Sequence, residues 1–169
     1  MKYFYMIVNH SKKKAEYGAE LISRYLRERG CECVVWDASD TEKRTSCRHA
    51  FRYTDSSTVP ARTQCVICLG GDGTLIQAAR DLAGSNIPLL GVNMGTLGYL
   101  AQIGREKDIF PALDELIADH YSLEKRIMLK GTVSSGGSTA AKDIALNDIV
   151  LSRFGLGMLR FNLYIDGEF

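Results

Sequence analysis

Four short, almost wholly apolar runs constrain the fold of this chain most strongly. They read YFYMIVN (residues 3–9), ECVVW (32–36), QCVICLG (64–70) and PLLGVN (88–93). Unbroken apolar runs of this length are typical of strands buried on both faces of a parallel sheet. Since helical patterns lie between or after them, over residues 11–30, 74–82 and 107–119, the order predicts a three-layer α/β/α domain around a parallel sheet.

The first helical pattern carries signals at both of its ends. Ser11 is expected to act as the N-cap and Gly30 as the C-terminal stop. The three lysines at 12–14 are interpreted as a solvated helix start rather than a phosphate clamp. After the second apolar run, residues 37–63 are polar and form a long connection, with a short helix expected around residues 41–51.

The periodicity changes near residue 120, which divides the chain into a first domain (1–120) and the start of a β-rich domain (121–169). Gly136-Gly137 and Asp166-Gly167 predict tight turns in the second part, between strands expected over residues 122–135, 143–153 and 160–166. Only two residues follow the last turn, so the hairpin lacks its second strand. The pattern favours a chain cut within a domain, with further residues beyond 169.

Charge and cysteine content narrow the class of protein. The 169 residues hold 21 basic and 20 acidic side chains, a net charge of +1, which offers no basic surface for nucleic acid or an anionic membrane. No apolar run reaches the roughly 20 residues of a membrane span, and a cytoplasmic location is expected, with all five cysteines reduced. Cys65 and Cys68 are interpreted as small apolar residues of a buried strand rather than as zinc ligands.

The stretch LGGDGTLIQAAR (69–80) is the candidate functional motif. Gly70, Gly71, Gly73 and Thr74 are predicted to form a phosphate loop, because backbone amides and a helix N-terminus attract anions. Thr74 and Gln77 have capping-box spacing, so the helix is expected to begin at Thr74. Neither a dinucleotide fingerprint nor a P-loop fits the stretch.

Asp72 lies among these glycines and can serve as a metal ligand or as a base. The structural alternative is an aspartate that makes a local turn bond before the helix.

GGDGT (70–74) resembles the signature of a kinase superfamily that contains NAD kinases, diacylglycerol and sphingosine lipid kinases, and 6-phosphofructokinases. GVNMGTLGYL (91–100) and ALNDIVLSR (145–153) resemble the second and third motifs of the NAD kinase family, in the same order and at similar spacing. The resemblance to the NAD kinase family covers essentially the whole chain.

This resemblance implies phosphoryl transfer from ATP, or polyphosphate in some members, to the adenosine ribose 2′-hydroxyl of NAD, with Mg²⁺ or another divalent cation. It makes Asp72 the proton acceptor and metal-associated carboxylate and places Gly73 beside the substrate ribose. It implies that Asn147 and Asp148 bind ribose hydroxyls and that Tyr99 lies near the adenine pocket. Family members are typically dimers or tetramers, so a homodimer or homotetramer is expected.

Some positions depart from the family pattern. Gln77 stands where many members have a basic residue. Many members have a second basic residue just before the segment YIDGE, and Arg160 is the nearest candidate for it in this chain. Asn93 fits either a ligand contact or a strand-to-helix turn. The alternatives for function are a lipid kinase of the same superfamily and a non-catalytic dinucleotide-binding protein or inactive truncated copy.

Overall fold

The computed structural model describes residues 1–36, 54, 56–95, 98–153 and 155–169. They form two compact units, Met1–Ile127 and Met128–Phe169. The helix expected around residues 41–51 lies outside the described residues. In the part of the chain that the structure describes, no helix has the length and apolarity needed to cross a bilayer.

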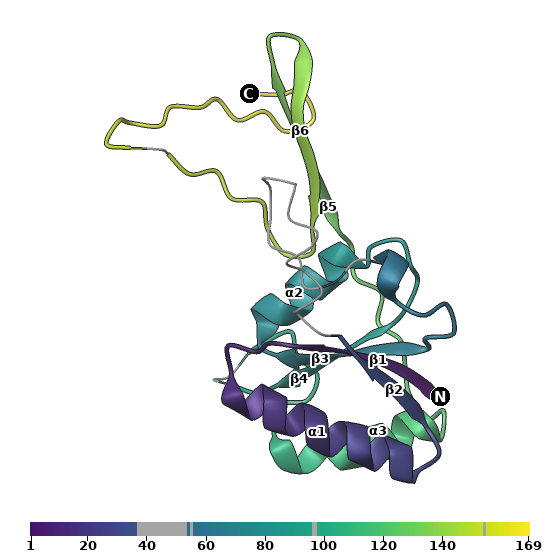
Figure 1. The fold of residues 1–169 in the computed structure, drawn as a ribbon. Coiled ribbons are helices and arrows are strands. Elements are labelled where there is room, and N and C mark those ends of the chain that lie inside the picture. The colour runs from purple at the N-terminus through teal and green to yellow at the C-terminus, as the bar shows by residue number, and fades with distance from the viewer. Residues whose placement is uncertain (37–53, 55, 96–97, 154) are drawn as a thin grey trace. The chain divides into compact units, whose positions relative to one another are not determined.

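The first unit is built on a parallel sheet of four strands, which confirms the interpretation of the four apolar runs (Figure 1). The strand order is β2-β1-β3-β4, with the bounds β1 Tyr3–Val8, β2 Glu32–Val35, β3 Cys65–Gly70 and β4 Leu89–Asn93. Every residue of β3 is buried, and so is all of β1 except its first residue. A central strand covered on both faces cannot carry polar side chains at alternate positions, which explains the unbroken runs.

Helices cover both faces of this sheet, as predicted. Helices α1 (Lys13–Glu28) and α3 (Ile109–Ile117) lie on one face, and α2 (Asp72–Asp81) lies on the other (Figure 1). A 3-10 turn over Glu106–Asp108 precedes α3. The core on the α1/α3 face includes Phe4, Met6, Ile22, Leu26 and Leu113, and the core on the α2 face includes Tyr5, Ile7, Val66, Leu75 and Ala78.

The expected N-cap of α1 is wrong. Ser11 does not cap the helix, because its hydroxyl donates to Oδ1 of Asn9 at 2.6 Å. Lys12 occupies the N-cap position and makes no side-chain capping bond. The stop at Gly30 is confirmed by its φ of +70°, a conformation that glycine adopts without strain.

The expected start of α2 is also wrong. The helix begins at Asp72, two positions before Thr74, so these two residues share its first turn. Thr74 is buried, and its hydroxyl accepts a bond from Nδ2 of Asn9 at 3.4 Å. Gln77 donates to Asp81 at 2.8 Å. Because Thr74 packs toward the end of β3 and Gln77 binds further along the helix, neither can complete a capping box.

Four described cysteines are free thiols inside this unit: Cys31, Cys33, Cys65 and Cys68. Burial raises the pKa of Cys33 to about 11 and of Cys65 to about 12, and it raises the pKa of Cys68 as well. The thiols of Cys33, Cys65 and Cys68 therefore stay protonated and behave as small apolar side chains. Among the described residues, no group of three metal-ligating side chains occurs.

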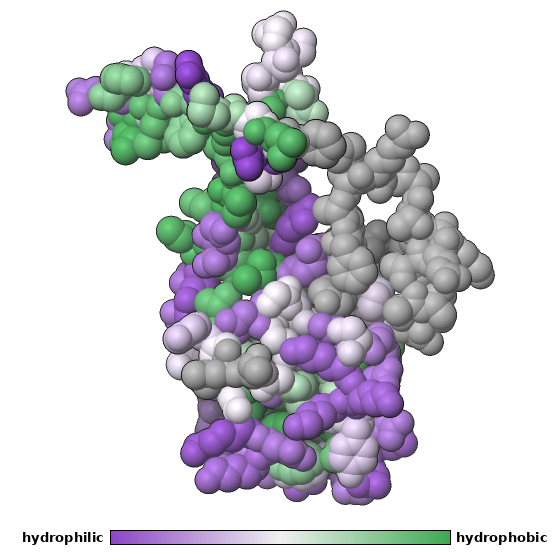
Figure 2. Space-filling view, turned by 90° about the vertical axis from the view of Figure 1, so that its left-hand side faces the viewer, coloured by the Kyte–Doolittle hydropathy of each residue, from purple (hydrophilic) through white to green (hydrophobic). Residues whose placement is uncertain are grey.

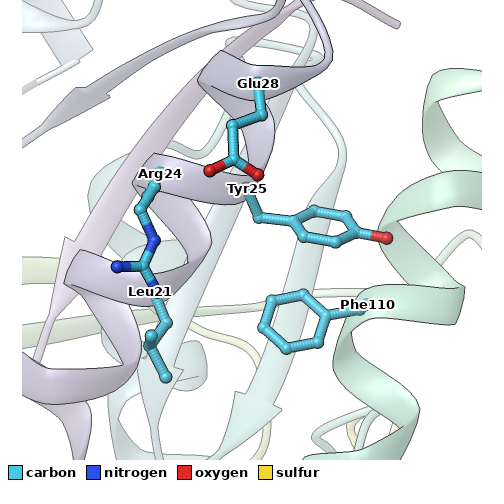
Figure 3. Close-up of a pocket in the computed structure, with 5 residues that line it drawn as sticks. All are labelled: Leu21, Arg24, Tyr25, Glu28 and Phe110. Carbon is cyan, nitrogen blue, oxygen red and sulfur yellow. The ribbon is translucent and has the colours of Figure 1, made fainter.

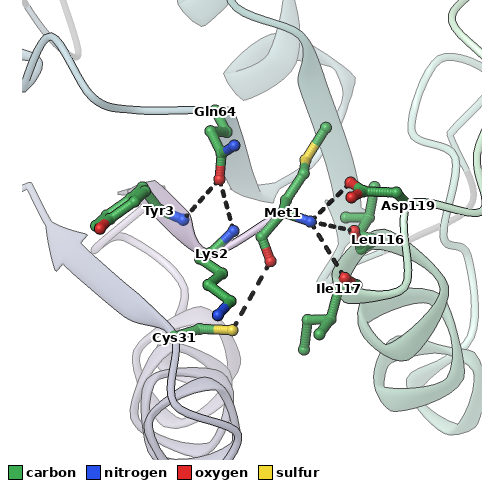
Figure 4. A network of polar contacts seen from close by, with 8 residues as sticks. All are labelled: Met1, Lys2, Tyr3, Cys31, Gln64, Leu116, Ile117 and Asp119. Carbon is green, nitrogen blue, oxygen red and sulfur yellow. Dashed lines mark hydrogen bonds and ion pairs between the residues drawn. The ribbon is translucent and has the colours of Figure 1, made fainter.

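The start of the chain is fixed by polar contacts at the end of α3 (Figure 4). The Met1 ammonium donates to the carbonyl oxygens of Leu116 and Ile117 at 2.9 and 3.2 Å, and to Oδ1 of Asp119 at 2.8 Å. Gln64 accepts the next two backbone N–H groups through its Oε1. A cation at the carboxyl end of a helix is favourably placed, so this network fixes β1 against α3 and β3.

The second unit contains a hairpin of β5 (Leu129–Ser135) and β6 (Ser138–Ala145). The turn at Gly136-Gly137 is confirmed, with φ of +57° and +79°. The turn at Asp166-Gly167 is confirmed too, since Ile165 and Glu168 exchange backbone bonds of 2.9 and 3.0 Å across it.

The strands expected over residues 143–153 and 160–166 are wrong in most of their length. Strand β6 ends at Ala145, and the later segment makes only the bridge between Ile165 and Glu168. A strand needs a partner for its backbone groups, and in the described part of the second unit these segments have none. Their apolar side chains stay exposed, among them Val150, Leu151, Leu156 and Phe161. Figure 2 shows apolar surface in green.

Candidate active site

The candidate site lies where the strand order of the sheet reverses. The chain leaves β1 toward β2 on one side and leaves β3 toward β4 on the other. In open parallel sheets, ligands bind beyond the carboxyl ends of the strands at such a switch point. Asn9 follows β1 and Gly71 follows β3, so the glycine motif stands at this position.

Asp72 accepts three backbone N–H groups from the segment that follows β4. Its Oδ2 accepts from Tyr99 at 2.7 Å, and its Oδ1 accepts from Leu100 and Ala101 at 3.1 and 3.2 Å. The bond from Tyr99 is the largest cause that lowers the pKa of Asp72, the other two act in the same direction, and desolvation opposes them. The carboxylate is therefore held ionised and oriented.

These bonds decide against the local turn bond as the structural alternative for Asp72. Its donors lie 27 to 29 residues further along the chain. The side chain joins the first turn of α2 to the second glycine motif, so two separate motifs of the sequence form one site.

The glycines of these motifs serve two different purposes. A β-carbon added at Gly98 would overlap the Asp72 carboxylate, and one added at Gly70 would overlap the Thr74 side chain. Both positions exclude a side chain because of contacts within the fold. At Gly73, by contrast, an added β-carbon would meet nothing within 4 Å. Nothing inside the described protein requires this glycine, and its open side lies at the first turn of α2.

Lys12 is a functional candidate that the sequence analysis set aside as part of a solvated helix start. Its Nζ lies 3.4 Å from the position of a β-carbon added at Gly71 and 2.5 Å from one added at Gly95. The ammonium thus stands beside the turns that follow β3 and β4. Lys13 and Lys14 are exposed, whereas Lys12 is partly buried.

Asn9 is a second residue that the sequence analysis missed. Its Oδ1 accepts the backbone N–H of Ser11 at 3.1 Å as well as the Ser11 hydroxyl, and its Nδ2 donates to Thr74. The turn before α1 is thereby tied to the first turn of α2. An asparagine directly after a buried strand was the available signal, because its side chain readily closes such turns.

Asn93 and Tyr99, two further residues predicted in the first unit, lie at the same edge of the sheet. Asn93 accepts the N–H of Gly95 at 2.9 Å, so it builds the turn after β4. Tyr99 is 93% exposed, with its ring free of core packing. The structure therefore brings the phosphate-loop residues, Asp72, Asn93 and Tyr99 together, whereas Gln77 is engaged with Asp81.

Asn147, Asp148 and Arg160 belong to the second unit. They are exposed, and Asn147 donates to Asp148 at 3.1 Å. Strand β6 ends at Ala145, before both residues, so neither lies on a strand face. Their part in ligand binding stays a prediction.

A pocket of about 420 Å³ lies elsewhere, between α1 and α3 (Figure 3). Its residues come from the second half of α1 and from Phe110, whose ring stacks on Tyr25 with centroids 4.4 Å apart. It contains none of the predicted site residues, so the carboxyl edge of the sheet remains the candidate site.

Fold and site together define a doubly wound α/β domain, with a glycine-rich turn and an oriented carboxylate at the switch point of its parallel sheet. A family model described as the ATP-NAD kinase N-terminal domain matches residues 4–121. The chain belongs to the NAD kinase family, which confirms the resemblance found in its motifs.

Curated relatives extend this match along the whole chain. NAD kinase of Lachnospira eligens is 40% identical over 170 residues, covering 100% of this chain and 56% of the relative. NAD kinase of Agathobacter rectalis is 41% identical over 175 residues, with the same two shares. The chain spans about half the length of these relatives. Yeast NADH kinase complexed with NADH shares the fold, with a TM-score of 0.61 at 19% identity over 87% of this chain and 47% of that structure.

The three bonds to Asp72 predict how stability changes with pH. A lowered pKa in the folded state stabilises the fold above the ordinary aspartate pKa of 3.8, and this stabilisation is lost as pH falls through the folded pKa. Asp72→Asn should therefore cost about 1 kcal/mol near neutral pH, since the amide nitrogen cannot accept a bond, and the cost should shrink in acid. Urea unfolding of both proteins between about pH 7 and about pH 3 measures this, with exposed Glu20→Gln as control. A cost independent of pH would contradict it.

Gly98 and Gly104 form a matched pair for testing the close approach to Asp72. Gly98→Ala should lower the free energy of unfolding by about 1–3 kcal/mol, because its β-carbon would displace the carboxylate. Gly104→Ala should change it by less than about 0.5 kcal/mol, because its β-carbon would meet no atom within 4 Å. Denaturant unfolding gives both values, and equal values would exclude the proposed contact.

Proposed function

We propose that the protein is an NAD kinase, which transfers a phosphoryl group from ATP to the adenosine ribose 2′-hydroxyl of NAD and gives NADP. The observation that carries the proposal is the Asp72 carboxylate, oriented by three N–H groups beside the open face of Gly73, in a chain that belongs to this family. The proposal concerns the whole protein, since the chain covers about half of its relatives.

Asp72 would act as the proton acceptor. A carboxylate offers roughly four acceptor positions, and three are occupied by backbone N–H groups, which leaves about one for the substrate hydroxyl. In the transfer, the bond between the γ-phosphorus and the oxygen that leaves with ADP breaks. A bond forms between this phosphorus and the 2′ oxygen, and the hydroxyl proton passes to Asp72. Because its pKa is lowered, Asp72 is a weak base that takes the proton late in this step.

A divalent cation would bind near Asp72 together with the phosphates of ATP. The described residues hold no cluster of three ligating side chains, and Asp72 is the carboxylate of the glycine motif. Magnesium usually keeps several waters and binds substrate phosphates, so a cation that arrives with ATP would reach Asp72 through one of its waters, while the free acceptor position of the carboxylate takes the substrate hydroxyl. Mg²⁺ or another divalent cation would neutralise phosphate charge there. The chain itself orients the carboxylate and presents the first N–H groups of α2, which have no acceptor within the helix.

Nucleotide contacts complete the proposal. Gly73 leaves room for the ribose, and the exposed ring of Tyr99 would stack on adenine. The second unit would be the start of the NAD-binding β domain, in which Asn147 and Asp148 hold ribose hydroxyls and Arg160 meets the dinucleotide phosphates. A cytoplasmic location and a homodimer or homotetramer belong to the same proposal, and the exposed apolar side chains of the second unit support the assembly.

The direct test uses the protein at its full natural length. Incubation with NAD, ATP and Mg²⁺ should form NADP, read with an NADP-specific dehydrogenase, at a turnover of about 1 per second or faster. Phosphorylation of diacylglycerol or sphingosine in vesicles, without NADP formation, would favour the lipid kinase instead. NAD binding without turnover would favour a non-catalytic dinucleotide-binding protein.

Gly73→Ala separates ligand binding from folding in the same protein. Alanine has the higher helix propensity, so thermal stability should stay unchanged or rise by up to about 1 kcal/mol. NADP formation should fall by at least roughly a hundredfold, because the methyl group fills the space reserved for the ribose and misplaces the hydroxyl. The measurement is a melting curve together with kcat/KM for NAD. Unchanged kcat/KM would contradict the placement of the substrate at Gly73.

A further inference from the structure

We infer that the ammonium group of Lys12 binds the phosphate chain of a nucleotide between the turns after β3 and β4. The inference rests on the proposed function for the presence of a nucleotide, and it adds a charged ligand to a site whose other groups are backbone amides and a carboxylate. The chemistry shared by the possible ligands is a di- or triphosphate.

The position of the ammonium is the first argument. Nζ of Lys12 approaches Gly71 and Gly95 on the side where each lacks a β-carbon. These two glycines belong to turns that follow neighbouring strands, so the cation stands at the carboxyl edge of β3 and β4. Glycine turns let a phosphate approach the main chain closely, and a cation beside them completes an anion site.

The charges around Lys12 are the second argument. Within the described residues, no carboxylate forms an ion pair with it. Asp72 is turned toward the N–H groups of residues 99–101, and Glu16 pairs with His10 at 3.2 Å. Lys12 is a partly buried residue, and an ammonium without a carboxylate partner forms strong charge-assisted bonds with a multiply charged phosphate.

The way the backbone holds Lys12 is the third argument. Its N–H donates to the carbonyl oxygen of Asn9 at 3.0 Å, and the Asn9 side chain is bonded to Ser11 and Thr74. The turn that carries the lysine is thus fixed to the first turn of α2. Lys13 next to it is exposed and serves as a matched control, since both substitutions remove one charge from the same turn.

The test measures binding to the protein at its full natural length by titration calorimetry. The probes are inorganic tripolyphosphate, ATP, NAD and, as the uncharged reference, adenosine. Lys12→Ala should weaken at least one phosphate-bearing probe about tenfold or more, equal to about 1.4 kcal/mol, and leave adenosine unchanged. Lys13→Ala should keep every affinity within about twofold, and Lys12→Arg should restore much of the loss.

The probes also distinguish the source of the phosphate. Loss for ATP and tripolyphosphate identifies the donor's chain, whereas loss for NAD alone identifies the pyrophosphate of the acceptor. If Lys12→Ala and Lys13→Ala weaken all probes equally, the inference is overturned. Binding is measured without turnover, so a protein that binds phosphate through Lys12 but forms no NADP would contradict the proposed function and leave this inference standing.

Discussion

The bonds between the Asp72 carboxylate and the three N–H groups of residues 99–101 organise the rest of the site. They join the start of α2 to the chain that leaves β4, so the two glycine-bearing motifs form one surface. They also keep the carboxylate ionised and fix the direction of its remaining acceptor position. Phosphoryl transfer depends mainly on positioning and charge stabilisation, so an oriented carboxylate of this kind is the feature that the proposed reaction would require.

The glycines around this site are required for different reasons. Gly70 and Gly98 are glycines because Thr74 and Asp72 occupy the space of a side chain. Gly73 has no such reason within the described protein, and this open space is where we propose that the substrate lies. This contrast separates the glycines that the fold itself requires from the one proposed to contact the substrate, which a motif alone does not do.

The sequence alone was enough to predict the parallel sheet and its two layers of helices, because unbroken apolar runs and helical spacing are local signals of burial. Turns such as Gly136-Gly137 were predictable for the same reason, since positive φ selects glycine. The start of α2 was not, because Thr74 is buried and bonded to Asn9, 65 residues away, rather than free to cap the helix. The strands expected after Ala145 are not formed, because strand formation depends on a partner strand as well as on the sequence pattern.

The candidate site was only partly predictable. The hydrogen-bond partners of Asp72 and the position of Lys12 are long-range contacts, and no local sequence pattern encodes them.

Amide hydrogen exchange at Tyr99, Leu100 and Ala101 tests most directly whether Asp72 holds the site together. In the folded wild-type protein these three amides should exchange at least about tenfold more slowly than in Asp72→Asn, with the largest change at Tyr99, whose bond would face the amide nitrogen. Amides in the middle of β3 serve as the reference: they exchange through global unfolding, so they should accelerate only about fivefold, as a loss of about 1 kcal/mol requires, and less than the three site amides. Equal exchange of Tyr99, Leu100 and Ala101 in both proteins would contradict the account.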